Sequence, residues 1–133
     1  MVGDSSIAPL TPVRGIILFA HGSRAPQWRE PIEAVAHALK QQHPKALCVC
    51  AYLELTEPDL PSACLSLINQ SCTQITVLPM FLGTGRHARH DLPVLVDTLR
   101  EQHPHVQFTV ATAVGEDPRV TALLAEIAAQ HIA

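Results

Sequence analysis

The sequence predicts an α/β fold with a four-stranded parallel sheet, in the strand order 2-1-3-4, and helices on both faces. The main observation is that short aliphatic runs alternate with segments in which apolar residues recur at helical spacing. Strands that alternate with helices in this way form parallel sheets through right-handed crossovers. The second observation is size, because 133 residues, 47% of them hydrophobic, suit one domain with a sizeable core.

The first half of the chain is expected to contain two strands and two helices. We expect residues 1–13 to form a flexible tail and residues 14–133 to form the single domain. Residues 15–20 are a nearly unbroken aliphatic run, typical of a central strand covered on both faces, and residues 46–53 predict the second strand. Helical spacing over residues 26–42 ends at His43-Pro44. The second helix is expected over residues 56–69, with Thr56 as its cap and Pro58 in its first turn.

The second half repeats this order of elements. Residues 75–79 predict a third strand, and a loop with two glycines leads into a helix that ends before Pro104. Residues 106–111 predict the fourth strand. Residues 117–131 should form the last helix, with an apolar face directed inward that consists of Val120, Leu123, Leu124 and Ile127.

Composition excludes several classes of partner. The formal net charge is −3 and aromatic residues make up only 4% of the chain, so we expect neither a basic nor a base-stacking surface for nucleic acid. No apolar run approaches the roughly 18 residues that cross a bilayer, and the first residues do not resemble a signal peptide. We therefore expect a cytoplasmic protein without a membrane or nucleic-acid partner. The four cysteines form no C-x-x-C pair and are interpreted as small buried apolar residues.

Chemically useful side chains follow the first three predicted strands. In an open parallel sheet, ligands bind beyond the carboxyl ends of the strands where the strand order reverses, here between strands one and three. His21 follows strand one, and the loop after strand three leads to His87. Gly22 allows a tight turn close to a ligand. Glu54, after strand two, brings a carboxylate toward the same rim.

Two imidazoles at one opening are expected to bind a metal ion. Neutral imidazole is a good ligand for first-row divalent metals, and it is mostly unprotonated at neutral pH. Two protein ligands are fewer than the four of a structural zinc site, which favours a weakly held metal that can be transferred. His90 is either a third ligand or a solvent-facing residue. Glu54 is either a surface carboxylate or a group that orients a histidine or accepts a proton.

Positive charge is expected around the same opening. Arg24, Arg86 and Arg89 flank the two histidines in the sequence, and arginine pairs with carboxylates through two parallel hydrogen bonds. These arginines are predicted to bind a substrate with several carboxylates, and we also count Ser23 among the substrate-binding residues. Ser23 beside His21 would suit a hydrolase, but the chain lacks the G-x-S-x-G elbow of that class.

Several short motifs occur together in the order and spacing of a known family. They are His21-Gly22-Ser23 after the first strand, the segment YLELTEP at residues 52–58, and Phe81-Leu82 followed by Gly85, His87, Asp91 and Pro93. On these motifs the chain resembles the short CbiX-like sirohydrochlorin cobaltochelatases from about Arg14 to its last residue. In several of those relatives an acidic residue precedes the Asp-x-Pro element, where this chain has His90.

The resemblance implies a chelatase-like fold, a homodimer, and a lyase that inserts a divalent metal, Co²⁺ first, into sirohydrochlorin during cobalamin-type tetrapyrrole synthesis. It assigns the metal to His21 and His87, while His21, His87 or Glu54 would accept the pyrrole protons. No permanently bound cofactor is implied, because the metal is a substrate. Insertion of Fe²⁺ or Ni²⁺ stays an alternative, since imidazole binds all three metals. A second alternative is a non-catalytic metal-binding module of the same fold.

Overall fold

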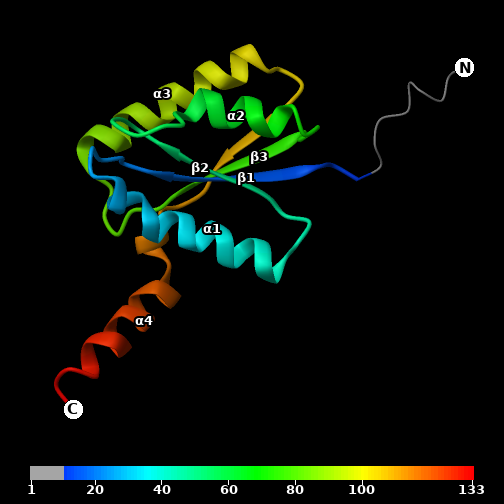
Figure 1. The fold of residues 1–133 in the computed structure, drawn as a ribbon. Helices are drawn as coiled ribbons and strands as arrows, with labels where there is room; N and C mark the ends of the chain where they lie inside the picture. Colours follow the sequence, from blue (N-terminus) through cyan, green and yellow to red (C-terminus); the bar gives the residue numbers. More distant parts are fainter. Residues whose placement is uncertain (1–10) are drawn as a thin grey trace, which may run out of the picture.

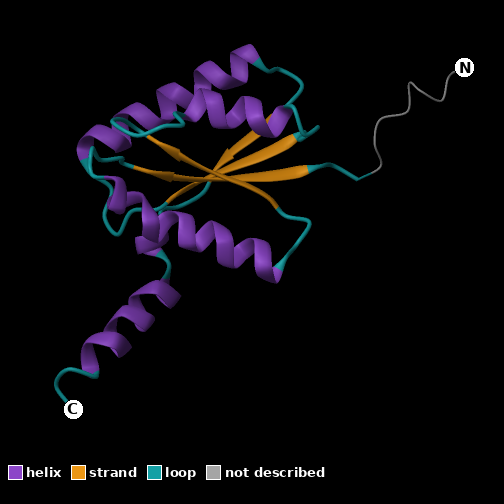
Figure 2. Cartoon of the chain, viewed as in Figure 1, coloured by secondary structure: helices purple, strands orange, loops and turns teal. Residues whose placement is uncertain are grey.

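The computed structural model describes residues 11–133, apart from the side chain of His87, and confirms the predicted α/β fold (Figures 1 and 2). The first ten residues of the predicted tail lie outside the described part of the chain. Four strands form one parallel sheet in the predicted order, β2-β1-β3-β4. They are β1 (Arg14–Ala20), β2 (Leu47–Tyr52), β3 (Gln74–Pro79) and β4 (Gln107–Val110).

Helices cover both faces of this sheet. Figure 1 shows α1 on one face and both α2 and α3 on the other, whereas α4 extends away from the sheet. Within the described residues, no helix is both long and apolar enough to span a membrane. The helices are α1 (Glu30–Gln42), α2 (Leu60–Ile68), α3 (Arg86–Gln102) and α4 (Pro118–Ala129), with short 3-10 turns at η2 (Pro26–Arg29) and η3 (Val114–Glu116).

Strand β1 is the centre of the fold, as its aliphatic run predicts. It pairs with β2 on one side and with β3 on the other, so both of its edges are hydrogen-bonded. The side chains from Ile17 to Ala20 are at most 1% exposed. Ile17 and Phe19 belong to the main core, together with side chains of α2 and α3 such as Leu67 and Val96. The carboxyl end of β1 therefore opens between two neighbouring strand ends, which is where His21 lies.

The expected start of the second helix is wrong. Helix α2 begins at Leu60, and the Asp59 side chain caps it by accepting a hydrogen bond from the Ser62 N–H at 2.9 Å. Pro61 occupies the first turn, where its missing N–H has no helical partner to lose. Thr56 has a different role, because its hydroxyl donates to the Ser23 carbonyl at 2.7 Å.

The inward-facing apolar stripe expected on the last helix is also wrong. Leu123, Leu124 and Ile127 of α4 are 55%, 44% and 46% exposed, and only Val120 is half-buried. The cause lies just before the helix, where η3 turns the chain and the Gly115 N–H donates to the Phe81 carbonyl at 2.9 Å. Helical spacing predicts that α4 has an apolar face, but it does not specify what covers that face.

The capping role of Asp59 is open to measurement. Replacing Asp59 by Ala should lower the free energy of unfolding by about 1 kcal/mol, because the Ser62 N–H loses its acceptor. Asp59→Asn should retain most of the stability, since Asn caps nearly as well as Asp. Urea unfolding followed by circular dichroism measures both variants. Equal losses in the two variants would contradict the assigned cap.

The cap also gives stability a dependence on pH. Hydrogen bonds from Ser62 hold the pKa of the Asp59 carboxyl below its usual value. Because this pKa is lower in the folded state, the contribution is fully present above the unfolded-state pKa. It is lost as the pH falls through the folded pKa, so the difference between the wild type and Asp59→Ala should shrink in acid.

Candidate functional site

His21 lies at the point where the strand order of the sheet reverses. It directly follows β1 and is half-buried. Its ring packs against the ring of Phe81, which follows β3, with the ring centroids 4.5 Å apart and the planes 33° from parallel. Phe81 is itself only 4% exposed, and its ring also contacts Phe19 in the core. The loops after β1 and β3 therefore meet, as the predicted strand order requires, and a core aromatic ring supports the imidazole.

The loop that carries His21 is also fixed to the segment after β2. The Leu53 N–H donates to the Ala20 carbonyl at 2.9 Å, and the Glu54 N–H donates to the His21 carbonyl at 3.0 Å. Gly22 has a φ of 97°, a conformation that residues with a Cβ rarely adopt. A Cβ at Gly22 would overlap the Glu54 carbonyl oxygen. The close approach of these two segments therefore requires a glycine after His21.

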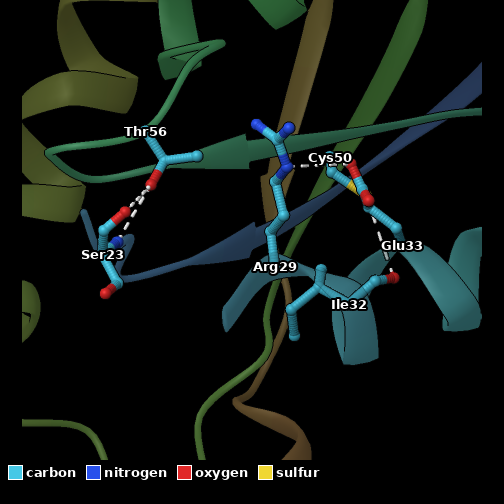
Figure 3. Close-up of polar contacts among 6 residues, drawn as sticks. All are labelled: Ser23, Arg29, Ile32, Glu33, Cys50 and Thr56. Atoms are coloured by element: carbon cyan, nitrogen blue, oxygen red, sulfur yellow. Dashed lines mark hydrogen bonds and ion pairs between the residues drawn. The ribbon is translucent and has the colours of Figure 1, made fainter. Parts of the chain in front are cut away.

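A second contact between the same two segments involves Ser23 and Thr56 (Figure 3). The Ser23 N–H donates to Thr56 Oγ1 at 2.9 Å, and the Thr56 hydroxyl donates back to the Ser23 carbonyl. Ser23 Oγ accepts a hydrogen bond from the Ala25 N–H at 3.1 Å, so the hydroxyl helps to shape its own loop. Leu55, between the two points of contact, has a φ of 64° and is 56% exposed. A role for Ser23 in binding substrate stays a prediction.

Glu54 lies close to the first turns of α3. It lines a cavity of about 330 Å³ together with His90 and Asp91 of that helix, next to Leu53, Val94 and Leu95. The structure thus brings the carboxylate that follows strand two and the start of α3 to one hollow. His90 is exposed at this hollow. Whether it serves as a metal ligand stays a prediction.

His87 is the second residue of α3, one turn before Asp91. The helix is preceded by Gly85, and the Arg89 N–H donates to the Gly85 carbonyl at 3.0 Å. The side chain of His87 lies outside the described part of the structure, so its role as a metal ligand stays a prediction. Among the side chains that are described, no three His, Cys, Asp or Glu residues group closely enough to hold a metal ion.

The predicted arginines do not gather in one cavity. Arg24 lines a hollow of about 290 Å³ with Ser23 and Leu55, on the β2 side of the His21 loop. Arg89 lines a larger cavity of about 810 Å³ between α3 and β4, together with Phe81. Arg86 is exposed at the start of α3. Positive charge therefore flanks the His21 loop on two sides rather than forming one cluster.

Sequence reasoning missed two exposed leucines in the segments that contact His21. Leu82 is 69% exposed and follows Phe81, the residue that supports the imidazole. Leu55 is 56% exposed and follows Glu54, whose N–H is bonded to the His21 carbonyl. A single exposed leucine is ordinary, but these two directly follow the residues that contact His21 from the β3 side and from the β2 side. The sequence could have pointed to both leucines, because each directly follows a predicted site segment and belongs to no helical pattern.

The cysteines do not take part in this site. Cys64 and Cys72 are buried, and Cys48 and Cys50 are half-buried on β2. Burial raises the pKa of Cys64 and of Cys50 to about 11. The neutral thiol is a poor metal ligand and a poor nucleophile. This confirms the interpretation of Cys64 and Cys72 as small apolar core residues.

The close approach at Gly22 leads to a direct test. Gly22→Ala should lower the free energy of unfolding by more than about 2 kcal/mol, because the new Cβ meets the Glu54 carbonyl and the backbone angle is strained. Gly83→Ala is the matched control, since a Cβ there has no atom within 4 Å. Thermal unfolding of both variants gives the comparison. If Gly22→Ala were as stable as Gly83→Ala, the described loop packing would be wrong.

Comparison with proteins of known sequence agrees with the motifs. The model of the CbiX family matches residues 15–131. A sirohydrochlorin cobaltochelatase from Sulfolobus acidocaldarius is 29% identical over 84% of this chain and 87% of its own length. A sirohydrochlorin ferrochelatase from Priestia megaterium is 27% identical over 84% of this chain. This chain covers only 42% of that longer relative.

Solved structures show the same fold. The CbiX protein from Marinobacter aquaeolei VT8 is 33% identical, has a TM-score of 0.78, and matches over 90% of this chain and 97% of its own. The sirohydrochlorin chelatase SirB from Bacillus subtilis subspecies spizizenii, in complex with cobalt, is 26% identical with a TM-score of 0.72. The match covers 81% of this chain and 46% of SirB. By its motifs, its strand order and the family model that spans its domain, this chain belongs to the CbiX family.

Proposed function

We propose that this chain is a sirohydrochlorin metal chelatase that inserts a divalent metal, with Co²⁺ as the first candidate. The observation that carries the proposal is the placement of His21, an imidazole held on Phe81 where the strand order reverses. Relatives that are named sirohydrochlorin cobaltochelatase and sirohydrochlorin ferrochelatase support the reaction class. The ferrochelatase makes Fe²⁺ the second candidate, and Ni²⁺ is the third because imidazole also binds it.

The metal is held by His21 and His87 before transfer. Two neutral imidazoles leave several coordination positions to water, so the ion is bound loosely enough to be released. Nitrogen atoms of the macrocycle replace the histidines one at a time. The metal is consumed as a substrate, and no permanently bound cofactor takes part.

Insertion of one M²⁺ releases two protons from the pyrrole N–H groups of the macrocycle. A histidine that has given up the metal regains a free lone pair and can accept one of them. Glu54 is the second acceptor in this proposal. Its support is that Glu54 lines the hollow at the start of α3 and that its own N–H fixes the His21 carbonyl. Proton acceptance then occurs beside the metal ligands.

Binding of the macrocycle combines apolar and charged contacts. Leu55 and Leu82, in the two segments that contact His21, offer exposed apolar surface, which suits the faces of a flat ring. Arg24 on one side and Arg86 and Arg89 on the other are the partners for the peripheral carboxylates. Fixing the carboxylates at two separated points would centre the ring over the bound metal.

The assembly and the location of the protein belong to the same proposal. The chain acts as a homodimer in the cytoplasm. The longer relatives support a two-unit arrangement, because this chain covers only 42% of the Priestia megaterium ferrochelatase and 46% of SirB. Two copies of this chain would supply the length that each of those proteins has in one polypeptide.

The histidine assignment is tested by measuring the change in sirohydrochlorin absorbance with Co²⁺, Fe²⁺ and Ni²⁺ in turn. His21→Ala and His87→Ala should each slow insertion at least about 100-fold, since loss of a direct ligand costs more than loss of an outer partner. His43→Ala, at the end of α1, is the control and should keep full activity.

Two outcomes would count against this assignment. Full activity in both His21→Ala and His87→Ala would show that the metal binds elsewhere. Tight metal uptake by the wild type, with no insertion above the protein-free rate for any of the three ions, would instead support a non-catalytic metal-binding module.

The role of Glu54 makes a separate prediction. Glu54→Gln keeps the size of the side chain but removes its capacity to accept a proton, so kcat should fall about 100-fold while KM changes little. Glu57→Gln, three residues further on and also exposed, is the matched control. Steady-state kinetics over a range of sirohydrochlorin concentrations separates the two parameters. An unchanged kcat for Glu54→Gln would leave proton acceptance to the histidines alone.

A further inference from the structure

Two histidines lie close together on the turn between α3 and β4. His103 directly follows α3, and His105 comes two residues later, with Pro104 between them. The ring centroids of the two histidines are 6.5 Å apart, and the ring planes are inclined at 76°. His103 is half-buried and His105 is exposed, so the second ring has room to turn. Neither histidine belongs to the candidate functional site.

Backbone hydrogen bonds fix the turn that carries the two rings. The His103 N–H donates to the Leu99 carbonyl at 2.9 Å, which closes the last turn of α3. The Val106 N–H then donates to the His103 carbonyl at 3.0 Å, and Val106 is only 6% exposed. Pro104 restricts the backbone further, because its ring fixes φ. The two imidazoles therefore extend from a fixed backbone, which lowers the entropy cost of binding a shared ligand.

A nearly identical turn after α1 shows what the fold itself requires. His43 has φ and ψ of −135° and 82°, against −131° and 68° for His103. The His43 carbonyl accepts from the Ala46 N–H at 2.9 Å, as the His103 carbonyl does in its own turn. Both turns have a histidine followed by proline, but the next residue is Lys45 in one and His105 in the other. The turn therefore does not need a histidine at position 105.

The spacing and the surroundings of the two rings suit a divalent metal ion. A metal–nitrogen bond is about 2.0–2.1 Å and the ring centre lies roughly 1 Å behind the nitrogen, so two imidazoles on one ion have centroids about 5–6 Å apart. A small rotation of the exposed His105 ring reaches that range from 6.5 Å. The carboxyl end of α3 carries partial negative charge, which favours a cation. Arg100 in its last turn is paired with Asp97 at 2.9 Å, so its positive charge is balanced.

We infer that His103 and His105 bind one first-row divalent metal ion, at a site separate from His21 and His87. Neutral imidazole is a good ligand for such ions, and water completes the coordination. Figure 1 shows the end of β1 and the start of α3 at one end of the sheet, and the end of α3 at the other. Helix α3 has 17 residues and at about 1.5 Å per residue is roughly 25 Å long. An ion at this turn is therefore too far away to be the one inserted in the proposed reaction.

The site is tested with the full chain and Co²⁺ alone, in a variant that lacks both proposed ligands of the other site. The His21→Ala/His87→Ala double variant should still bind one Co²⁺ per chain in isothermal titration calorimetry. Adding His105→Lys copies the turn after α1 and should weaken this binding at least about 10-fold, because a direct ligand is lost. Adding His43→Ala instead is the control and should leave the binding unchanged. Circular dichroism confirms that each variant is folded.

Two further measurements on the double variant locate the ion. Co²⁺ is paramagnetic, so the amide NMR signal of Val106 should shift or broaden on binding, while that of Ala46 should not. Adding Lys45→His places a second imidazole on the turn after α1. The variant should then bind two Co²⁺ per chain, and the Ala46 signal should respond as well.

Three results would overturn this inference. Undiminished Co²⁺ binding after His105→Lys would show that the ion is held elsewhere, and so would an unchanged Val106 signal during binding. An unchanged count of ions after Lys45→His would overturn the claim that two imidazoles on this turn are sufficient. None of these results depends on the chelatase reaction. In the otherwise unaltered chain, His105→Lys should insert metal into sirohydrochlorin at the wild-type rate, so this site and the proposed function are tested separately.

Discussion

The hydrogen bond from the Glu54 N–H to the His21 carbonyl, with the approach of Gly22 that accompanies it, holds the site together. It joins the segments after two neighbouring strands at the point where each leaves the sheet. Without it, the segment after β1 would lose a backbone link to the segment after β2 at the residue that carries the imidazole. A metal that must be passed on needs ligands that are placed in advance but bind weakly. Backbone contacts provide that placement without adding a ligand.

The position of β1 in the sheet determines which loops can meet. Because β1 lies between β2 and β3, its carboxyl end has neighbours on both sides. Phe81 supports the imidazole from the β3 side, and Ser23 and Thr56 fix the loop on the β2 side. The exposed leucines and the arginines then lie outside this rigid centre. In the proposed chelatase, this arrangement would give the metal a fixed point and leave a wide margin for a large ring with several carboxylates.

Periodicity in the sequence predicts most of the fold, because a strand covered on both faces and a one-sided helix leave different patterns. The run at residues 15–20 and the stop at His43-Pro44 are both found as expected. Which of two similar residues caps a helix is harder to predict from the sequence. Thr56 and Asp59 are both good caps, but Asp59 caps α2, while the Thr56 side chain bonds to Ser23, far away in the sequence. The exposed face of α4 depends on how η3 turns the chain, which periodicity does not record.

The candidate site, like the fold, could be predicted from the sequence only in part. The meeting of the His21 loop with the loop after β3 could be predicted, since it depends only on strand order. The distribution of the arginines could not be predicted. Arg24 and Arg89 reach separate hollows through side-chain packing, which the sequence does not specify. The central claim is that His21 and His87 hold one metal ion between them. Anomalous diffraction from a crystal soaked with Co²⁺ tests it most directly. The account predicts a cobalt peak about 2.0–2.2 Å from one ring nitrogen of each histidine; a peak bound to only one of them, or to neither, would contradict it.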